Sequence, residues 1–498
     1  MDALAFEHHL TSPQGRGHHP SGGHSATTGG YACGDEVTLR IAVDGDHVTD
    51  AGFDAHGCGA STAAASVAVS LARGTPILTA ARVGAQDIAQ ELGGLSPGKV
   101  HAAELAADAL ARALGAAVRA DARIAPDHHT PATLVAMSGG VDSAVAAHLC
   151  AQAGPTMAVT LELWADAEND AERSCCSATA VAQARSLAHR MGIPHLTIDL
   201  REEFRAGVVE PFIAGYAAGE TPNPCVGCNG HVRLDAMLEL ADRLGCAHLA
   251  TGHYARTAES ADARGPLLRA AADSAKDQTY MLAALKPESL ARMRFPLGEL
   301  RKPEVREIAA RAGLPVASKV DSQDLCFLAG TSRARFMERH GDIHARPGEI
   351  VNSAGSVLGR HEGQHRFTVG QRRGLNLQSS EPLFVLHKDG PSGRIVVGPR
   401  DQLRTDQVAI RGARLHREGS RVDRVKLRYR QRPLSATLAG EAGEGRHRSL
   451  SLKLAEPVDG AAPGQLACLM DGDLVVGWGT IDGRVGPVLN LNSTSHDV

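Results

Sequence analysis

The sequence contains no long hydrophobic run. Its longest stretch of small apolar residues is AAASVAV at 63–69, far short of the ~20 residues that a membrane-spanning helix needs. The start of the chain has no apolar segment of the kind found in secretory leaders. The formal net charge is only -4, so any contact with nucleic acid must come from a local basic surface and not from the overall charge. These absences predict a soluble, cytoplasmic protein with no membrane partner.

Internal repeats are also absent, and aromatic residues make up only 3% of the chain. With 43% hydrophobic and 22% charged residues, the composition is that of a globular protein and excludes wholesale disorder, collagen and coiled coil. A chain of 498 residues predicts about three to four domains.

Ten cysteines stand out in a chain expected to lie in a reducing compartment. There, thiols serve metal binding or catalysis more often than a disulfide framework. Cys150, Cys246 and Cys468 fit the pattern of small core residues. The adjacent pair Cys175 and Cys176 is assigned no role beyond that of an auxiliary thiol site.

The first quarter of the chain predicts an α+β unit. Residues 1–29 are rich in Gly, His, Ser and Thr without hydrophobic periodicity, which is typical of a mobile arm. Alternating apolar residues on either side of the turn at 44–46 predict a β-hairpin. Helical periodicity follows over about 60–73 and 99–118. We therefore expect a domain over 1–124 and a proline-containing linker over 125–131.

Strand and helix patterns then alternate from 132 to 330, which predicts a doubly wound α/β domain with a parallel sheet and right-handed crossovers. Short alternating segments separated by turns follow, and they predict small β-rich domains over 331–402 and 403–498. Charge is uneven: residues 1–130 have a net charge of -6, whereas 411–432 holds nine Arg and Lys against two acids. The basic surface is therefore expected near the C-terminal end.

SGGVDS at 138–143 follows a strand of the buried type and opens a helix. Gly139 and Gly140 let the backbone approach a phosphate, the helix N-terminus supplies N–H groups, and Ser138 and Ser143 add hydroxyls. The motif has no lysine of the kind that contacts a γ-phosphate in GxxxxGK[ST]. It therefore favours release of pyrophosphate in an adenylyl transfer over hydrolysis of the γ-phosphate.

This loop resembles the pyrophosphate loop of the ATP pyrophosphatase superfamily. Five further ordered blocks make the chain similar to one branch, the bacterial tRNA-specific 2-thiouridylases: TPNPCVGCN at 221–229, ATGHYAR at 250–256, KDQTYML at 276–282, DSQDLCF at 321–327 and FTVGQRRGL at 367–375. The resemblance implies an ATP- and Mg²⁺-dependent tRNA sulfurtransferase that forms 2-thiouridine at the wobble uridine and releases AMP and pyrophosphate.

Two cysteine positions carry the chemistry in that resemblance. Cys225 and Cys228 form a C-x-x-C between prolines, in an expected loop just before a helix starting near Gly230, where the helix dipole favours a thiolate. Cys326 lies in another expected loop, beside Asp321 and Asp324. The resemblance implies that Cys228 is the nucleophile and that Cys326 carries a persulfide sulfur, which displaces AMP from the adenylated base.

The same resemblance implies binding residues. The nucleotide would contact Ser138, Gly139, Gly140, Val141, Asp142, Ser143, Leu161 and Gly252. The tRNA, and no DNA, would contact Asn223, Pro224, Cys225, His253, Lys276, Asp277, Gln278, Arg428, Tyr429 and Gln465. Arg428 and Tyr429 fall within the basic segment, in what reads as an alternating strand, so phosphate binding there is expected.

Cys225 departs from many members of that family, which have an acidic residue at this position. Three thiols, Cys225, Cys228 and Cys326, can then converge, and three cysteinates can hold a 4Fe–4S cluster whose fourth iron is open to sulfide. Both the persulfide relay and this cluster remain open, and iron and sulfide analysis of anaerobically purified protein distinguishes them.

The N-terminal unit resembles the iron–sulfur scaffold family of IscU, SufU and NifU N-domains through CGD at 33–35, GCGAS at 57–61 and KVHAAELAADAL at 99–110. The third family cysteine is replaced by Ala102. Cys33, Asp35, Cys58 and His101 still offer four ligands that zinc accepts. Two interpretations remain open for this unit. It is either a functional zinc or iron–sulfur site, or a degenerate scaffold that docks a cysteine desulfurase or sulfur carrier. For the whole chain, a non-catalytic iron–sulfur or zinc carrier with a vestigial nucleotide module is the alternative to an enzyme.

Overall fold

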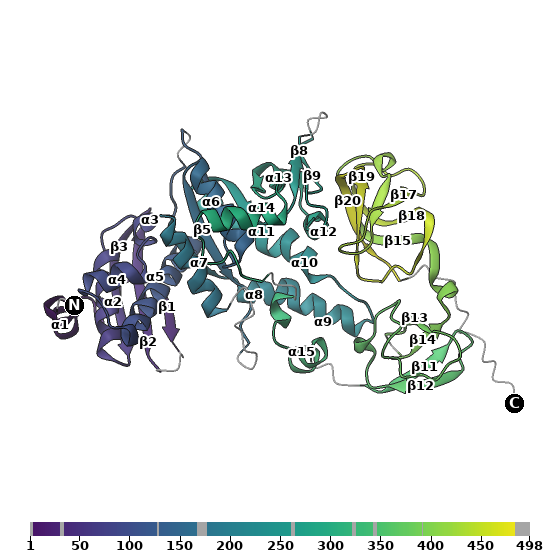
Figure 1. Ribbon diagram of the computed structural model, residues 1–498, viewed down its shortest axis with the longest axis horizontal. Coiled ribbons are helices and arrows are strands. Elements are labelled where there is room, and N and C mark those ends of the chain that lie inside the picture. Colours follow the sequence, from purple (N-terminus) through teal and green to yellow (C-terminus); the bar gives the residue numbers. More distant parts are fainter. Residues whose placement is uncertain are drawn as a thin grey trace. The chain divides into compact units, whose positions relative to one another are not determined.

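The computed structural model describes residues 3–29, 34–126, 129–166, 177–259, 264–320, 325–341, 346–390 and 392–483. The chain divides into two compact units. Figure 1 labels their helices and strands. The first unit comprises Met1–Glu202, Asp235–His253 and Arg292–Gly330, and the second comprises Glu203–Leu234, Tyr254–Ala291 and Thr331–Val498. The four domain boundaries expected from the sequence stay predictions.

The first unit begins with a three-stranded antiparallel sheet in the order β1-β2-β3, formed by β1 (His24–Gly29), β2 (Glu36–Asp44) and β3 (His47–His56). β2 and β3 confirm the predicted hairpin. The expected mobile arm over 1–29 is wrong, because α1 (Ala3–Thr11) is helical and β1 pairs with β2 from His24–Ile41 to Gly29–Glu36. The pairing uses backbone groups, so a strand with few apolar side chains leaves little hydrophobic pattern to detect.

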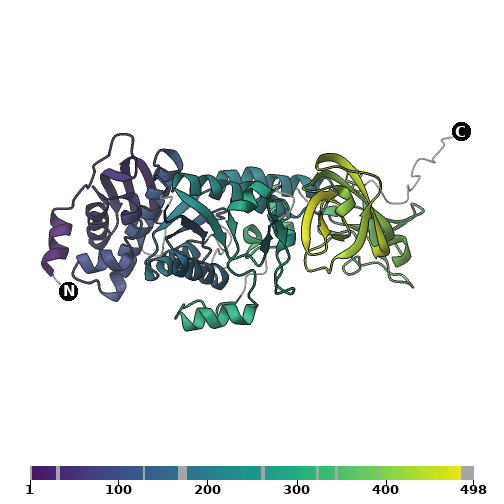
Figure 2. The same ribbon diagram turned by 90° about the horizontal axis from the view of Figure 1, so that it is seen from above.

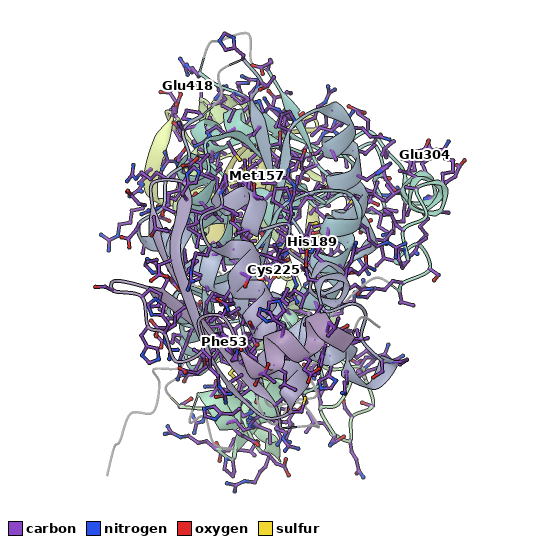
Figure 3. All side chains as sticks on the ribbon, turned by 90° about the vertical axis from the view of Figure 1, so that its left-hand side faces the viewer. Phe53, Met157, His189, Cys225, Glu304 and Glu418 are labelled. Carbon is purple, nitrogen blue, oxygen red and sulfur yellow. The ribbon has the colours of Figure 1, made fainter. Side chains whose placement is uncertain are left out.

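Helices cover this sheet, and the predicted helical segments are confirmed. They are α2 (Gly59–Ala72), α3 (Ile77–Ala80), α4 (Ala85–Glu91), the short η1 (Pro97–Lys99) and α5 (Val100–Ala120). The alanine-rich α2 and α5 pack on each other and on the sheet, and Phe53 on β3 is fully buried (Figure 3). Small side chains allow this close packing with few aromatic residues in the core.

The second part of this unit is a five-stranded parallel sheet in the order β10-β7-β4-β5-β6, which confirms the α/β prediction. Its strands are β4 (Ala132–Ala136), β5 (Thr156–Glu162), β6 (His195–Asp199), β7 (Cys246–Thr251) and β10 (Met293–Arg294). The accompanying helices are α6 (Val141–Ala153), α7 (Ala178–Arg190), α11 (Leu234–Arg243), α14 (Lys302–Arg311) and the one-turn η5 (Cys326–Leu328).

Helix α5 belongs to both parts, because it packs on β1 and β2 and also on the edge strand β6 (Figures 1 and 2). Gly115 allows the approach, since a Cβ atom there would overlap the carbonyl oxygen of Thr197. His189 of α7 lies close to the carbonyl oxygen of Ala81, with Nε2 3.0 Å away. The scaffold-like domain therefore packs directly against the parallel sheet.

Buried charges also cross this interface. Arg112 of α5 donates to Asp108 at 2.8 Å and pairs with Glu162 at the end of β5, and Arg185 of α7 pairs with Asp108. Burial acts to raise the pKa of Asp108, but the Arg185 and Arg112 guanidinium groups hold it below its ordinary value. Burial raises the pKa of Glu162.

The second unit starts with helical turns that carry the C-x-x-C motif. α8 (Arg201–Phe204) leads into the π-helical η3 (Arg205–Val209) and α9 (Glu210–Ala217), followed by α10 (Pro224–Gly227) and the π-helical η4 (Cys228–Arg233). Two further helices are α12 (Thr279–Leu282) and α13 (Pro287–Arg292).

The β-rich part of this unit confirms the prediction for the C-terminal region. After α15 (Arg333–His340), a four-stranded sheet in the order β12-β11-β14-β13 is formed by β11 (Gly348–Asn352), β12 (Val357–His361), β13 (Phe384–Lys388) and β14 (Ile395–Gly398). Short 3₁₀ turns are η6 (Gln364–Arg366), η7 (Arg400–Leu403) and η8 (Gly419–Arg421).

The last sheet has eight strands in the order β15-β18-β17-β16-β19-β20-β9-β8, and pairing of β15 with β20 closes it into a barrel. Its strands are β8 (Arg256–Ala258), β9 (Leu267–Arg269), β15 (Arg404–Leu415), β16 (Arg424–Lys426), β17 (Leu434–Leu438), β18 (Gly445–Asp459), β19 (Leu466–Asp471) and β20 (Leu474–Ile481). Inward-facing aliphatic residues such as Ile410, Leu452 and Leu469 fill it. Across the described residues, no helix combines the length and apolar character needed to cross a membrane.

Candidate functional site

The SGGVDS segment forms a tight connection between the central strand β4 and helix α6. The Ser138 backbone N–H donates to Ser143 Oγ at 3.1 Å, and Ser143 Oγ donates to the Gly140 carbonyl at 3.1 Å. Gly139 has a φ of 67°, and a Cβ atom there would lie 2.7 Å from the Ala180 carbonyl oxygen. Glycine is therefore required at this position for both conformation and space.

Helix α6 begins without a side-chain cap among the described residues. Gly140 is its N-cap and supplies no side-chain hydrogen bond. Uncapped N–H groups and the helix dipole together favour a phosphate there. Gly252 packs against this turn, since a Cβ atom on it would lie 2.7 Å from the Ser143 nitrogen.

Sheet register explains why residues distant in sequence meet at this loop. Thr251 pairs with Ala136, so Gly252 follows directly beside the loop. On the other side the Met137 N–H donates to the Val159 carbonyl at 2.8 Å, which puts Leu161 at the same carboxyl edge. The sheet therefore gathers the whole predicted nucleotide set: Ser138, Gly139, Gly140, Val141, Asp142, Ser143, Leu161 and Gly252.

Two lysines that the sequence did not reveal also reach the loop. Lys302 Nζ lies 2.7 and 2.9 Å from the Asp142 carboxylate oxygens. Lys319 Nζ donates to the Gly139 carbonyl at 3.0 Å. They follow the loop by 160 and 180 residues, so no local spacing pattern pointed to them.

The C-x-x-C segment is helical, so the expectation of a loop followed by a helix near Gly230 is wrong. The helix begins at Pro224, and Asn223 caps it by accepting the Cys225 N–H at 3.1 Å. Proline suits the first helical position because it needs no N–H there. Cys225 is half-buried, and Cys228 is 8% exposed at the start of the π-helical turn η4.

The backbone just before this motif is held by both β-rich sheets of the same unit. Arg411 of β15 pairs with both carboxylate oxygens of Glu220, at 2.8 and 2.9 Å. Gln465 Nε2 donates to the Thr221 carbonyl at 2.6 Å, and Lys388 Nζ donates to the Glu220 carbonyl at 3.3 Å. Gln465, a predicted tRNA contact, therefore also anchors the segment that leads to Cys225.

The cysteines predicted to transfer sulfur do not all belong to the same compact unit. Cys326 is half-buried at the start of η5 and belongs to the first compact unit, whereas Cys225 and Cys228 belong to the second. Several predicted residues lie outside the described residues: Cys33, Cys175, Cys176, Asp321 and Asp324.

Two residues of the KDQ motif at 276–278 bond to other residues of the protein. Lys426 Nζ lies 2.6 Å from the Asp277 carboxylate, whose side chain is 5% exposed. Gln278 Oε1 accepts the Tyr254 N–H at 2.9 Å. The third member, Lys276, is half-buried. Asp277 and Gln278 therefore hold the segment in shape. His253, in the first unit, lies with Nδ1 2.9 Å from Thr251 Oγ1.

Much of the basic segment 411–432 is paired inside the protein. Arg411, Arg421 and Lys426 have carboxylate partners, and Arg417 is buried. The expected alternating strand ends at Lys426, and Arg428 and Tyr429 lie in the turn that follows. Arg430 adopts a φ of 64°, which a strand does not allow.

A groove of about 720 Å³ adjoins that turn on the second unit. Its lining includes Arg400, Arg404 and Arg428, together with Gln431 and Asp459. Arg428 is exposed, and its guanidinium donates to the Gly460 carbonyl at 3.2 Å. This groove offers guanidinium groups to a polyanion, a role in keeping with the predicted tRNA contact at Arg428.

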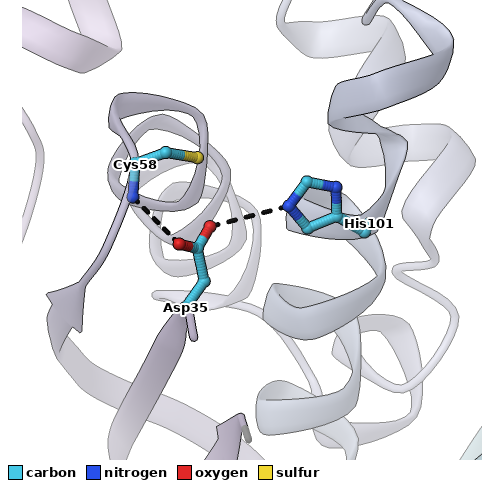
Figure 4. A group of neighbouring side chains, drawn as sticks. All are labelled: Asp35, Cys58 and His101. Carbon is cyan, nitrogen blue, oxygen red and sulfur yellow. Dashed lines mark hydrogen bonds and ion pairs between the residues drawn. The ribbon is translucent and has the colours of Figure 1, made fainter. Parts of the chain in front are cut away.

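Three of the predicted ligands of the N-terminal site meet in one place (Figure 4). One ligand atom from each of Asp35, Cys58 and His101 lies within 4.8 Å of the others. Asp35 accepts the Ser61 hydroxyl at 2.6 Å and the Cys58 N–H at 3.1 Å, and the Ser61 hydrogen bond is the main cause that lowers the pKa of Asp35. A Cβ atom on Gly57 would overlap the Asp35 carboxylate.

His101 gives the strongest sign that this cluster suits a cation. Its Nε2 is buried, accepts and donates no hydrogen bond among the described residues, and lies 3.6 Å from Asp35 Oδ2. This nitrogen has the long ion-pair contact with Asp35 but no hydrogen bond, and a buried polar atom without a hydrogen bond is costly unless a ligand satisfies it. Carboxylate, thiolate and imidazole form a donor set that zinc accepts, so the residues fit a metal ion.

Cys150, Cys246 and Cys468 lie outside the proposed metal and transfer sites. Burial raises the pKa of Cys150 to about 11 and that of Cys246 and Cys468 to about 12. Cys246 and Cys468 are buried as expected for core residues, whereas Cys150 is half-buried. Thiols with raised pKa values are poor nucleophiles.

Four family models match the chain in series. A NifU-like N-terminal domain matches residues 5–120, and a tRNA methyl transferase HUP domain matches residues 132–330. A tRNA methyl transferase PRC-barrel domain matches residues 334–399, and an aminomethyltransferase beta-barrel domain matches residues 400–481.

A bifunctional protein NifU/MnmA from Rubrobacter xylanophilus is 43% identical over 491 residues, covering 96% of this chain and 97% of that protein. A tRNA-specific 2-thiouridylase MnmA from Acidithiobacillus ferrooxidans is 42% identical, covering 70% of this chain and 98% of that protein. The solved U34-tRNA thiolase NcsA from Methanococcus maripaludis, with its 4Fe–4S cluster, is 16% identical with a TM-score of 0.25, covering 42% of this chain and 66% of that one. The chain belongs to the family of bifunctional NifU/MnmA proteins.

Proposed function

We propose that this protein is an ATP-dependent tRNA sulfurtransferase that forms 2-thiouridine at the wobble position and carries its own sulfur-supply domain. The observation that carries the proposal is the SGGVDS loop, in a chain that matches a NifU/MnmA protein over 96% of its length. The loop has the glycine conformation and uncapped helix N-terminus that a phosphate chain needs, and it carries no lysine of its own.

In the first step, the 2-oxygen of the uridine attacks the α-phosphorus of Mg²⁺-bound ATP. The bond to the bridging oxygen breaks, pyrophosphate leaves with the bonding electrons, and the uridine loses its N3 proton. The 2-oxygen is then part of an AMP ester, which is a good leaving group. The loop residues and Gly252 orient the nucleotide for this attack.

In the second step, the terminal sulfur of a persulfide on Cys326 attacks carbon 2 of the base and AMP departs. The Cys228 thiolate attacks the Cys326 sulfur and takes its place in a Cys228–Cys326 disulfide, which leaves the transferred sulfur on the base. A thiol reductant then restores both cysteines for the next turnover. Cys228 and Cys326 are the proposed catalytic residues.

An iron–sulfur cluster is the alternative sulfur carrier. Cys225 and Cys228 lie one helical turn apart, which suits two ligands to one cluster, and Cys326 would supply the third. Bound there, the cluster would supply an iron site for sulfide. Iron and sulfide counting on anaerobically purified protein separates the two versions, because a fully active metal-free protein excludes the cluster.

For the N-terminal domain we propose a metal or sulfur site at Asp35, Cys58 and His101, with Cys33 as the fourth predicted ligand. Bound zinc would hold the Cys58 sulfur as a thiolate. This domain would receive sulfur from a cysteine desulfurase or sulfur carrier. The C-terminal barrel, with Arg428, Tyr429 and Gln465, would hold the tRNA, and Asn223, Pro224, Cys225, His253, Lys276, Asp277 and Gln278 would lie near the target base.

The test is release of AMP and pyrophosphate from ATP in the presence of a sulfur donor, with and without unmodified tRNA. Both products and 2-thiouridine in the tRNA, detected by mass spectrometry of its nucleosides, are expected only when tRNA is present. The control is the same tRNA already thiolated. Absence of a tRNA-dependent product would favour a non-catalytic metal or iron–sulfur carrier and refute the proposal.

A further inference from the structure

The phosphate loop lacks a full positive charge of its own. The α6 dipole is equivalent to about half a charge at its N-terminus. Asp142 adds a negative charge, and Lys302, whose side chain is 11% exposed, pairs with it. The loop and Lys302 together are therefore close to neutral, whereas the phosphate chain of ATP is strongly anionic.

Lys319 brings a further cation to this loop. Its Nζ donates to the Gly139 carbonyl at 3.0 Å and to Gln183 Oε1 at 2.7 Å. An ammonium group has three N–H donors. Contacts with the described residues account for two of them, and the third has no partner among those residues, which allows it to bind an oxygen of an anion on the loop.

A side chain of α14 holds the backbone around Lys319 by hydrogen bonds. Arg306 donates to the Ala317 carbonyl at 2.7 Å and to the Lys319 carbonyl at 3.1 Å. The Lys319 N–H donates to the carbonyl of Val316, which is fully buried. Arg306 lies one turn after Lys302 on the same helix, and α14 packs on α6, so one helix holds both lysines at the loop.

We propose that Lys319 binds the phosphate chain of ATP and stabilises the departing pyrophosphate, and that Arg306 is the residue that positions it. The inference deepens the proposed function and rests on it for the identity of the nucleotide. As the bond from the α-phosphorus to the bridging oxygen breaks, negative charge builds on the pyrophosphate. The Lys319 ammonium stabilises this charge.

The sequence position adds a consequence. Lys319 precedes Cys326 by seven residues, so the phosphate contact and the proposed sulfur-bearing cysteine share one short segment. A lysine inside the loop, as in GxxxxGK[ST], would leave this segment unconnected to the nucleotide. Here the cation that the loop lacks comes from the segment that leads to the thiol.

The test is equilibrium binding to the full chain by calorimetry, with three ligands: Mg²⁺–ATP, Mg²⁺–pyrophosphate and AMP. Lys319→Met is expected to weaken ATP and pyrophosphate binding by about tenfold to a hundredfold, the range for a hydrogen bond to a charged group. AMP binding should stay within about twofold. Lys319→Arg should recover most of the affinity, and Arg306→Gln should show the same pattern with a smaller loss.

Arg311→Gln is the matched control, because Arg311 is on the same helix, is 69% exposed and pairs with Glu307. It should bind all three ligands like the wild type. Unchanged pyrophosphate affinity in Lys319→Met, or equal losses for AMP and pyrophosphate, would overturn the inference, since the second outcome means that Lys319 only supports the loop. Binding needs no turnover, so a wild type that binds pyrophosphate but forms no tRNA-dependent product refutes the proposed function alone.

Discussion

The two cysteine-bearing regions that the sequence singles out are built differently. Asp35, Cys58 and His101 come from one small domain, and their ligand atoms lie within 4.8 Å of one another. The transfer cysteines are divided, with Cys228 in one compact unit and Cys326 in the other. The proposed ligands of the first region therefore already lie together, whereas the two proposed transfer cysteines belong to different compact units.

The largest expected effect concerns Cys228 and Cys326. Cys228→Ser and Cys326→Ser should each lower the rate of 2-thiouridine formation by at least about a thousandfold, because serine neither carries a persulfide nor forms the disulfide. The measurement is mass spectrometry of tRNA nucleosides with a cysteine desulfurase supplying sulfur. Cys150→Ala is the control, and it should stay within about twofold. A wild-type rate in either serine variant would show that the substituted cysteine is not catalytic.

The second prediction tests whether the scaffold domain and the parallel sheet fold as one unit. Asp108→Ala leaves Arg185 and Arg112 without their shared partner at a buried interface, which should lower the free energy of unfolding by about 3–5 kcal/mol. Urea unfolding followed by circular dichroism measures it. Glu307→Ala, which removes an exposed ion pair, should leave the midpoint unchanged. An equally small effect for Asp108→Ala would show that the interface contributes little to stability.

The third prediction concerns the cluster of Asp35, Cys58 and His101. Cys58→Ala and Asp35→Asn should each weaken zinc binding by more than about tenfold, measured by competition with a chromogenic chelator. His56→Ala changes an exposed histidine nearby and should bind zinc like the wild type. With glutathione persulfide as donor, which can pass its outer sulfur to the Cys326 thiolate directly, tRNA thiolation by all three variants should remain within about twofold of the wild type. Loss of thiolation under that condition would show that the two regions are not separate in function.

The last prediction concerns Lys388, whose ammonium donates to the Glu220 carbonyl just before the C-x-x-C motif. Burial lowers the pKa of Lys388 to about 8, below the ordinary value of 10.5. Between these pH values the unfolded chain binds more protons than the folded chain, so stability rises with pH, by at most about 3 kcal/mol from this group. Urea midpoints of wild type and Lys388→Met at pH 8, 9 and 10 measure the difference. Parallel curves for the two proteins would contradict the prediction.

Much of the fold followed from local patterns. Alternating apolar residues gave the hairpin, and strand–helix alternation gave the parallel sheet. The strand at His24–Gly29 did not, because backbone pairing with β2 stabilises it and its side chains are small and polar. The helical start at Pro224 was also missed, although Asn223 before a proline is an N-cap signal that was available.

The sequence by itself determined the phosphate loop, the two cysteine groups and the family resemblance, because these depend on residue type and short spacing. Only the tertiary structure decided which distant groups meet them. Lys319 and Lys302 reach the loop across more than 150 residues, and Gln465 anchors Thr221. Arg411, Arg421 and Lys426 of the basic segment pair with carboxylates of the same unit. Such contacts depend on sheet register and helix packing, which bring together residues that no local pattern connects.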